Sequence, residues 1–426
     1  MARLAFARER EGSHLPPAKD VWREFSSDPA QGLLALYGWG QLDLQRNKEP
    51  AREGLGEFVV DPLSRLFGSI PVRDTEQFER LGASAFFDRG DSGELRITAI
   101  HWCHGGCVVR PGDYAWEHAK YVWRCSLGVK VTAVDHLVHT HWIVSNAFST
   151  SLRESFRADH PIRRLLHVNI FNTASVNYSA FWGLYPKDGF LHRMTPWEHD
   201  GLVGALEAGF SSFRYRTWPQ AYDECDMPED LKATMPMWED GLAVWKMLRE
   251  WHAAYIDLYY DTELHVLADP EIQQYWTFRT TPQYTRGLPP LSKEALIDQV
   301  THSVFWACAF HEFVGGAVEY VTDPGGLFLQ VRPGQTMADM QHMVQAQSLT
   351  AATGSPMPKL SGDWSYLLDL GHSAGTNKLF ERVRVLHGGL ARRMREVSAE
   401  IAERNTRRPQ SFSAFDPLTF ECSVSL

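Results

Sequence analysis

The chain has little cysteine and no long apolar run. Its 426 residues include 6 cysteines, scattered in no pattern typical of a disulfide framework, which indicates a reducing compartment. No apolar stretch approaches the roughly 20 residues that a membrane-spanning helix needs, so we expect no integral membrane span. Arginines interrupt the short apolar run at the N-terminus, unlike a secretory signal. These absences predict a cytoplasmic protein.

The chain also lacks an excess of positive charge. Its 42 Lys and Arg are outnumbered by 52 Asp and Glu, which gives a formal net charge of -10. Nucleic acids and anionic membrane surfaces attract proteins through basic residues, so we expect neither as the main partner. The composition is 44% hydrophobic and 12% aromatic. That is enough for a large core and excludes a disordered chain.

The hydrophobic pattern predicts a mainly α-helical fold with a small antiparallel β-hairpin region near the N-terminus. Residues 1–82 are rich in Gly, Pro and charge, and we interpret them as an irregular wrapping segment with short helical pieces. Residues 83–87 and 94–100 flank a Gly/Asp turn, which is a hairpin signal. No repeat or linker interrupts residues 83–426, which indicates one large domain. Helices are expected at residues 115–126, 131–157, 161–180, 196–208, 238–260, 292–321, 336–348 and 377–405.

Three histidines lie within six positions of the helix predicted over residues 131–157. They are His136, His139 and His141, in an otherwise apolar segment. One interpretation is a polar helix face with incidental histidines, and the other is a pair of metal ligands, because neutral imidazole is the commonest transition-metal ligand. His136 and His141 are five positions apart, which separates them by about 140° on a regular α-helix. They can face one metal only if the helix widens locally, as π-helical turns at functional sites do.

Two other sets of histidines and cysteines need an interpretation. His311 lies in the apolar helix predicted over residues 292–321, and His302 is too far along that helix to share one metal with it. Taken alone, His311 could equally be a core histidine bonded to a carbonyl. The run His101–Cys107 could form half of a zinc knuckle, but no second half follows at finger-like spacing. We interpret that run as a loop leaving the hairpin.

Several motifs follow one another along the chain in a fixed order. His136–His141 reads His-Leu-Val-His-Thr-His, His160–Leu166 reads His-Pro-Ile-Arg-Arg-Leu-Leu, and Ala309–Val314 reads Ala-Phe-His-Glu-Phe-Val. In this order they resemble the catalytic domain of the lipoxygenases, which has His-Trp-Leu-x-Thr-His, His-Pro-Ile/Leu-x-Lys-Leu-Leu and Ala-x-His-Ala-Ala-Val. Further similar segments are Trp116–Lys120, Val176–Asn177, Asp240–Trp245, Asp269–Gln273, Ile401–Asn405 and Ser423–Leu426. The resemblance covers residues 83–426 and is closest to short, bacterial-type members.

The resemblance implies one non-haem iron, with manganese as the other metal to consider. The implied ligands are His136, His141, His311 and the α-carboxylate of Leu426, a set that leaves room at an octahedral iron. The implied reaction begins when ferric hydroxide abstracts a hydrogen atom from a 1,4-pentadiene of a polyunsaturated fatty acid. Dioxygen then traps the radical to give a hydroperoxide. The partners are therefore O2 and a small-molecule substrate, either a fatty acid or a smaller diene or metabolite.

Three features depart from the family pattern. Gly315 stands where the family has a weak ligand, usually Asn, and glycine has no side chain to coordinate. Residues 131–133 read Val-Thr-Ala where the family has His-Gln-Leu, so the network behind the iron must differ, and His139 could supply part of what is missing. We also expect no β-sandwich domain in front.

These departures leave two other functions open. One is a lipoxygenase-fold iron oxidase or oxygenase that acts on a smaller, non-lipid metabolite at a more open iron, because a fold does not fix a substrate. The other is a metal-binding or scaffold protein without activity. Bound redox-active iron and oxygen uptake would separate the enzymes from the scaffold, and a conjugated-diene product from linoleate would separate the two enzymes.

Overall fold

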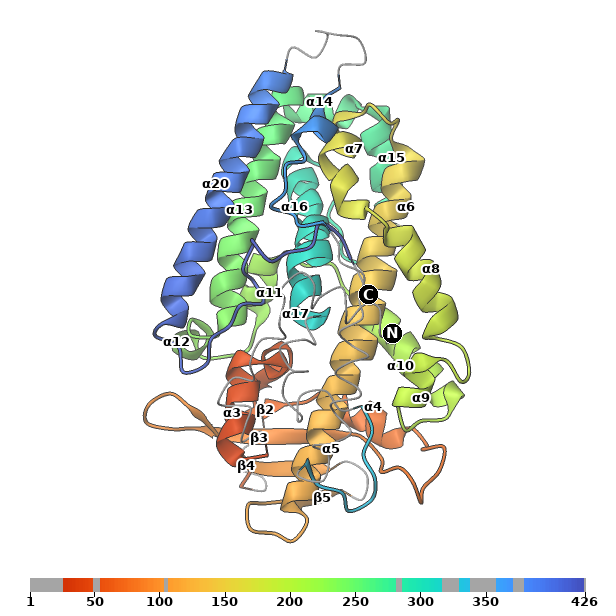
Figure 1. Cartoon of the computed structure of the whole chain (residues 1–426), viewed down its shortest axis with the longest axis vertical. Coiled ribbons are helices and arrows are strands. Elements are labelled where there is room, and N and C mark those ends of the chain that lie inside the picture. The colour runs from red at the N-terminus through yellow and green to blue at the C-terminus, as the bar shows by residue number, and fades with distance from the viewer. Residues whose placement is uncertain are drawn as a thin grey trace, which may run out of the picture.

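The computed structural model describes residues 26–48, 54–102, 106–280, 286–315, 329–337, 358–370 and 379–424. These residues form an elongated helical body with a small β-sheet at one end (Figure 1). The mainly α-helical fold predicted from the sequence is confirmed. Among the described helices, none is long and apolar enough to cross a membrane.

The sheet contains the predicted hairpin and extends it on both sides. The strands are β1 (Leu44–Arg46), β2 (Phe58–Val60), β3 (Ala83–Arg89), β4 (Leu95–Trp102) and β5 (Cys107–Val109), paired antiparallel in that order. The hairpin β3–β4 pairs Ala83 with Trp102 and Arg89 with Leu95. β1 and β2 come from the segment before residue 83, so this part of the segment is hydrogen-bonded to the sheet. The division of the chain at residue 83 stays a prediction.

Helices make up the rest of the described chain. In the first part they are α3 (Asp28–Tyr37), η1 (Trp39–Leu42), α4 (Ser64–Ser69), α5 (Trp116–Val129), η2 (Lys130–Ser145), α6 (Asn146–Ser155), α7 (Pro161–Leu166), η3 (His167–Ile170), α8 (Thr173–Gly183), α9 (Phe190–Met194), α10 (His199–Ser212) and α11 (Trp218–Glu224). In the second part they are α12 (Glu229–Lys232), α13 (Pro236–Tyr259), α14 (Glu263–Ala268), α15 (Pro270–Arg279), α16 (Lys293–Val304), η4 (Phe305–Phe310), α17 (His311–Gly315), η6 (Ser365–Leu368) and α20 (Phe380–Asn405).

Most of the predicted helices are present, with one correction. The helix expected over residues 161–180 is split into α7, η3 and α8, because Asn172 adopts a left-handed conformation with φ 58° before α8 begins. Asparagine tolerates that conformation better than most residues, so it can start a new helix at a different angle. Most of the helix expected over residues 336–348 lies outside the described residues.

Two long helical runs pass through the centre of the molecule. One is α5, η2 and α6, which follow each other without a break from Trp116 to Ser155, and the other is α16, η4 and α17. Both runs are mostly buried, as expected for helices that are apolar on all sides. They lie side by side in Figure 1, and η2 contacts both η4 and α17. This contact brings two distant parts of the sequence together.

Candidate metal centre

The widening predicted for the histidine helix is present. η2 is a π-helix over 16 residues, from Lys130 to Ser145, and the backbone N–H of Asn146 donates to the carbonyl of His141 five positions earlier. Each turn therefore holds more residues than in an α-helix. His136 and His141, which are five positions apart, come to lie on one side of the helix. The spacing of the two histidines was thus a correct signal for π-helical geometry.

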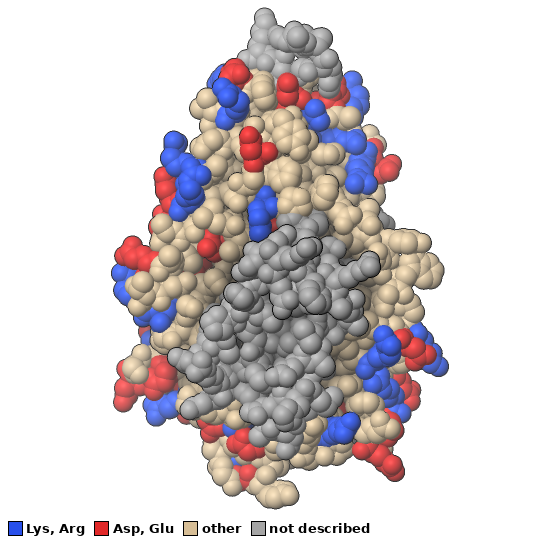
Figure 2. Space-filling view, in the orientation of Figure 1, with Lys and Arg blue, Asp and Glu red and all other residues tan. Residues whose placement is uncertain are grey.

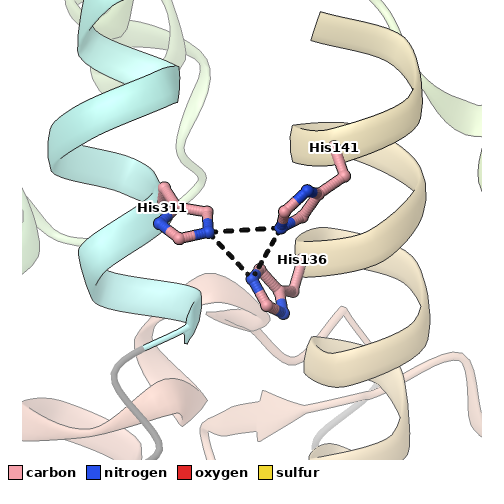
Figure 3. A group of neighbouring side chains, drawn as sticks. All are labelled: His136, His141 and His311. Carbon is pink, nitrogen blue, oxygen red and sulfur yellow. Dashed lines mark hydrogen bonds between the residues drawn. The ribbon is translucent and has the colours of Figure 1, made fainter. Parts of the chain in front are cut away.

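His136 and His141 point toward His311, which begins α17 on the neighbouring helical run (Figure 3). The Nε2 atom of His136 lies 3.1 Å from Nε2 of His311 and 3.1 Å from Nε2 of His141. The third side of the triangle, between Nε2 of His311 and Nε2 of His141, is 3.2 Å. Among the residues that the structure describes, these three form the one group of His, Cys, Asp or Glu side chains that could together hold a metal ion.

Asn177 fixes the orientation of His141. Nδ1 of His141 lies 2.9 Å from Oδ1 of Asn177, whose Nδ2 donates to the carbonyl of His141 at 3.0 Å. Because an amide oxygen only accepts, Nδ1 must carry the proton, and the lone pair is left on Nε2. Nε2 is the atom that faces the other two histidines, so Asn177 presents His141 as a ligand.

Burial favours the neutral form of His136 and His141. It lowers the pKa of His141 to about 4, although the hydrogen bond with Asn177 acts in the opposite direction. The pKa of His136 is well below its ordinary value because of burial and the adjacent rings of His141 and His311. A metal ligand must be unprotonated, so neutral imidazoles at the half-buried His136 and the buried His141 are suited to metal binding at neutral pH.

The triangle has the size that a single metal ion requires. With metal–nitrogen bonds of about 2.0–2.1 Å, the range for zinc, nitrogens separated by 3.1–3.2 Å subtend angles of about 95–106° at the metal. Angles of this size lie between those of an octahedron and a tetrahedron, and three nitrogens on one side of the ion leave other positions open. Without a cation, converging nitrogen lone pairs would repel each other. The residues present therefore fit a transition metal.

His139 belongs to a different cluster. Its Nε2 lies 3.0 Å from the carbonyl of Gly209, and its Nδ1 lies 3.6 Å from Oδ1 of Asp135. Nζ of Lys130 is 2.8 Å from Asp135 and 2.9 Å from Asp43. His139 therefore joins a buried ionic cluster of Asp43, Lys130 and Asp135.

This ionic cluster links η2, the helix that carries His136 and His141, to Asp43 in the segment before β1. Burial alone would lower the pKa of Lys130, but the two carboxylates outweigh burial and raise it. The carboxyl of Asp135 is held below its ordinary pKa by Lys130 and His139, against the effect of burial. Sequence reasoning missed Lys130 and Asp43. The five-residue spacing of Lys130 and Asp135, the same as that of the two histidines, is a signal that could have found this pair.

Gly315 lies against the histidine cluster, as its position four residues after His311 predicted. A Cβ atom built on it would stand 3.0 Å from Nε2 of His136, which is closer than ordinary van der Waals contact. Any side chain here would therefore press on a ring of the cluster. Val131 and Ala133, where the family has His and Leu, are buried, and Thr132, where the family has Gln, is half-buried.

The other candidates do not join the cluster. His302 is fully buried and packs against the rings of Tyr215 and Trp306. In the segment interpreted as a loop, residues 103–105 lie outside the described part of the chain, and so does Leu426. The part played by the C-terminal carboxylate therefore stays a prediction.

Comparison with known proteins gives the class to which this fold and site belong. The family model described as Lipoxygenase matches residues 108–340, more than half of the chain. The chain therefore belongs to the lipoxygenase family.

Individual relatives are distant. The chain is similar to linoleate 9/13-lipoxygenase of Pseudomonas aeruginosa, with 25% identity over 299 residues that make up 66% of this chain and 39% of that protein. It thus spans about two fifths of that relative's length. A solved LOX in complex with arachidonate has a TM-score of 0.80 and 16% identity, over 96% of this chain and 68% of that one. A Fusarium graminearum lipoxygenase has a TM-score of 0.78 and 14% identity, over 94% of this chain and 80% of that one. These two structures show a shared fold.

Proposed function

We propose that the chain is a non-haem iron dioxygenase that inserts O2 into a 1,4-pentadiene of a polyunsaturated fatty acid to give a hydroperoxide. The observation that carries this proposal is the triangle of three Nε2 atoms, 3.1–3.2 Å apart, between η2 and α17. Three neutral imidazoles with open positions beside them suit a metal that must also react with small molecules. The lipoxygenase family membership supports iron and this reaction class.

Each residue has a distinct part in this proposal. His136, His141 and His311 hold the iron, and the α-carboxylate of Leu426 is the proposed fourth, anionic ligand. Bound iron supplies one-electron redox chemistry that the side chains of this chain lack. Asn177 keeps the lone pair of His141 on Nε2, and the apolar side chains around η2 and η4 limit the access of water to the cluster. Manganese is the metal that analysis must distinguish from iron.

The substrate class is proposed from the relatives. The Pseudomonas aeruginosa protein is named for linoleate, and the solved LOX complex contains arachidonate. Both ligands are fatty acids, so linoleate and arachidonate are the substrates to test first. The cytoplasm remains the proposed compartment, and all five cysteines in the described part of the chain are free thiols.

One observation favours a second candidate, which is an oxidase or oxygenase of a smaller, non-lipid metabolite. Gly315 carries no side chain beside Nε2 of His136, and a Cβ there would stand 3.0 Å from that atom. Because no side-chain ligand can come from this position, a heteroatom of a small substrate could bind the metal directly. Fatty acids offer no such group at their pentadiene, so direct coordination would distinguish the two substrate classes.

The test combines metal analysis with oxygen consumption. We expect about one iron per chain, and oxygen uptake with a conjugated-diene product from linoleate. His136→Ala and His311→Ala should lose both metal and turnover. His139→Ala is the matched control, since it removes an imidazole from the same helix that faces away from the cluster, and it should keep its metal. Iron without diene formation, together with uptake driven by polar dienes or phenols, would favour the second candidate. A chain without metal would refute both.

A further inference from the structure

Exposed aromatic side chains lie on α8, just before it at Phe171, and at the start of α9 at Phe190. We call Phe171, Tyr178, Phe181, Trp182 and Phe190 the aromatic patch; their exposed fractions are 53%, 68%, 47%, 61% and 37%. Tyr178, Phe181 and Trp182 lie at positions i, i+3 and i+4, so they share one helix face. Ring centroids are 6.2 Å apart between Tyr178 and Trp182, and 5.4 Å apart between Phe181 and Trp182. Contiguous apolar surface of this kind marks an interaction site.

The patch lies in a stretch without charge. From Leu165 to Pro186 the sequence contains no Asp, Glu, Lys or Arg, although α8 lies at the surface of the molecule (Figure 1). A helix facing water normally carries charged residues on its outer side. Phenylalanine, tyrosine and tryptophan on an uncharged face are instead typical of surfaces that enter the interface between lipid and water.

Basic residues flank the patch on both sides. From His160 to Trp197 the chain carries Arg163, Arg164, Lys187 and Arg193 and one acidic residue, Asp188, for a charge of +3 in this segment, and Asp159 and Glu198 lie directly outside it. The guanidinium groups of Arg163 and Arg164 donate to backbone carbonyls of Phe156 and Asp369. Figure 2 shows uncharged atoms over the region of α8, with Lys and Arg side chains above and below and acidic groups interspersed.

We propose that the aromatic patch docks on the surface of a lipid bilayer that contains anionic phospholipid. Aromatic side chains would enter the headgroup region, and the flanking basic residues would face the lipid phosphates. The choice of a bilayer over a protein partner rests in part on the proposed function, because fatty acids partition into membranes. From the net charge we expected no anionic membrane surface as the main partner, but the segment His160–Trp197 that contains α8 carries +3.

The other face of α8 connects the patch to the metal centre. Asn177, which binds both Nδ1 and the carbonyl of His141, is buried on the inner face next to the exposed Tyr178. Phe181 contacts Tyr185, whose ring packs against Trp142, the residue that follows His141. One short helix therefore separates the docking surface from a residue of the histidine cluster. Docking would place the cluster close to the source of a lipid substrate.

Sedimentation of the full chain with vesicles tests the proposal. The vesicles are phosphatidylcholine alone, or phosphatidylcholine with phosphatidylglycerol. We expect binding to both, stronger on the anionic vesicles, and at least a tenfold loss of affinity in Phe181→Ser/Trp182→Ser. Lys187→Glu/Arg193→Glu should weaken binding to the anionic vesicles selectively. Tyr114→Ser/Tyr366→Ser is the matched control, because those aromatics are 106% and 62% exposed but lie elsewhere. It should bind like the wild type.

Three results of the vesicle experiment would overturn docking. The first is that the wild type does not bind vesicles, and the second is that the control variant loses as much affinity as the patch variant. The third is that Phe181→Ser/Trp182→Ser binds vesicles like the wild type while its circular dichroism spectrum is native. Self-association in solution that the same variant abolishes would assign the patch to a second copy of the chain and would also overturn it. Binding is measured without turnover. Vesicle binding by a chain that does not oxygenate linoleate would therefore refute the proposed function and support docking.

Discussion

Lys130 and Asp135 form a buried ion pair whose spacing follows the π-helix. Nζ of Lys130 is 2.8 Å from Oδ2 of Asp135, and the two residues are five positions apart, like His136 and His141. On an α-helix that spacing would place them about 140° apart around the axis. The pair thus forms in the same widened geometry that aligns the two histidines. Asp43 holds the same ammonium group from outside the helix at 2.9 Å.

Replacement of Lys130 should destabilise the protein and weaken its metal site. Lys130→Met leaves Asp43 and Asp135 buried without a counter-charge, and the loss of one partner from a buried pair costs about 3–5 kcal/mol. Urea unfolding gives the free energy, and competition with a chelator gives the metal affinity. Lys246→Met is the control, since Lys246 pairs with Glu250 at 3.9 Å on an exposed helix face. It should change stability by less than about 0.5 kcal/mol. Equal effects of the two substitutions would contradict a role for the buried pair.

Asn177→Ala should reduce metal affinity more than stability. Without the amide, Nδ1 of His141 loses its acceptor, so the ring is free to rotate or to carry its proton on Nε2. Loss of such a partner typically costs about 10–100-fold in metal affinity. Asn405→Ala is the comparison, because Asn405 also makes paired hydrogen bonds, to the backbone of Phe412, far from the cluster. If both variants keep wild-type affinity, Asn177 has no part in presenting His141.

His252 should make the protein sensitive to acid. Burial lowers its pKa to about 3, and its Nδ1 lies 3.0 Å from the hydroxyl of Thr301. Between the ordinary histidine pKa of about 6.5 and that value, the unfolded chain binds a proton that the folded chain does not. The contribution of neutral His252 to the free energy of unfolding is therefore complete above about pH 6.5, and it is lost as the pH decreases toward 3. In His252→Gln the slope of unfolding free energy against pH should be smaller by about 1.4 kcal/mol per unit in this window. An unchanged slope in urea titrations at pH 4.5, 5.5 and 6.5 would show that His252 does not contribute to the acid sensitivity of the protein.

Gly315→Asn should keep iron and change the preferred substrate. The new side chain would stand beside His136, where the family usually has its weak ligand, and the His136 ring would have to shift by a few tenths of an ångström to admit its Cβ. It would then compete with direct coordination of a small substrate. We expect fatty-acid dioxygenation to rise relative to any turnover of a smaller substrate. Gly204→Asn is the control, because no atom lies within 4 Å of a Cβ built at that position. The plain lipoxygenase proposal is favoured if Gly315→Asn is kinetically silent and the spectrum of the iron does not respond to any substrate.

Extension of the C-terminus should remove iron. If the α-carboxylate of Leu426 is a ligand, an added tag turns it into a neutral amide and moves the true terminus away. The same tag at the N-terminus should leave the metal in place. Full iron content and turnover in the C-terminally tagged protein would refute Leu426 as a ligand.

The sequence predicted those features that depend on local spacing. His136 and His141 indicated a π-helix because no other helix brings them together, and the hairpin β3–β4 followed from alternating residues around a turn. Pairing between distant segments was not predictable in the same way. Asp43 meets Lys130 across 87 positions of the sequence, and β1 and β2 join the sheet through backbone bonds that carry no sequence signal. The excess of basic residues in the segment that contains α8 was missed because the net charge of a chain does not show where its charges lie.

The positions of the three histidines in the sequence also determine when, during translation, their cluster can assemble. Two of its corners are translated together, and the third follows 170 residues after His141. A nascent chain that ends before α17 already contains the whole of η2, including its buried lysine and aspartate, but no complete metal site. Domains fold as units as they leave the ribosome, so the cluster can form only after nearly three quarters of this chain has emerged. If the cluster binds a metal as proposed, metal loading is a late step of biogenesis, and a product truncated before α17 would lack the third histidine.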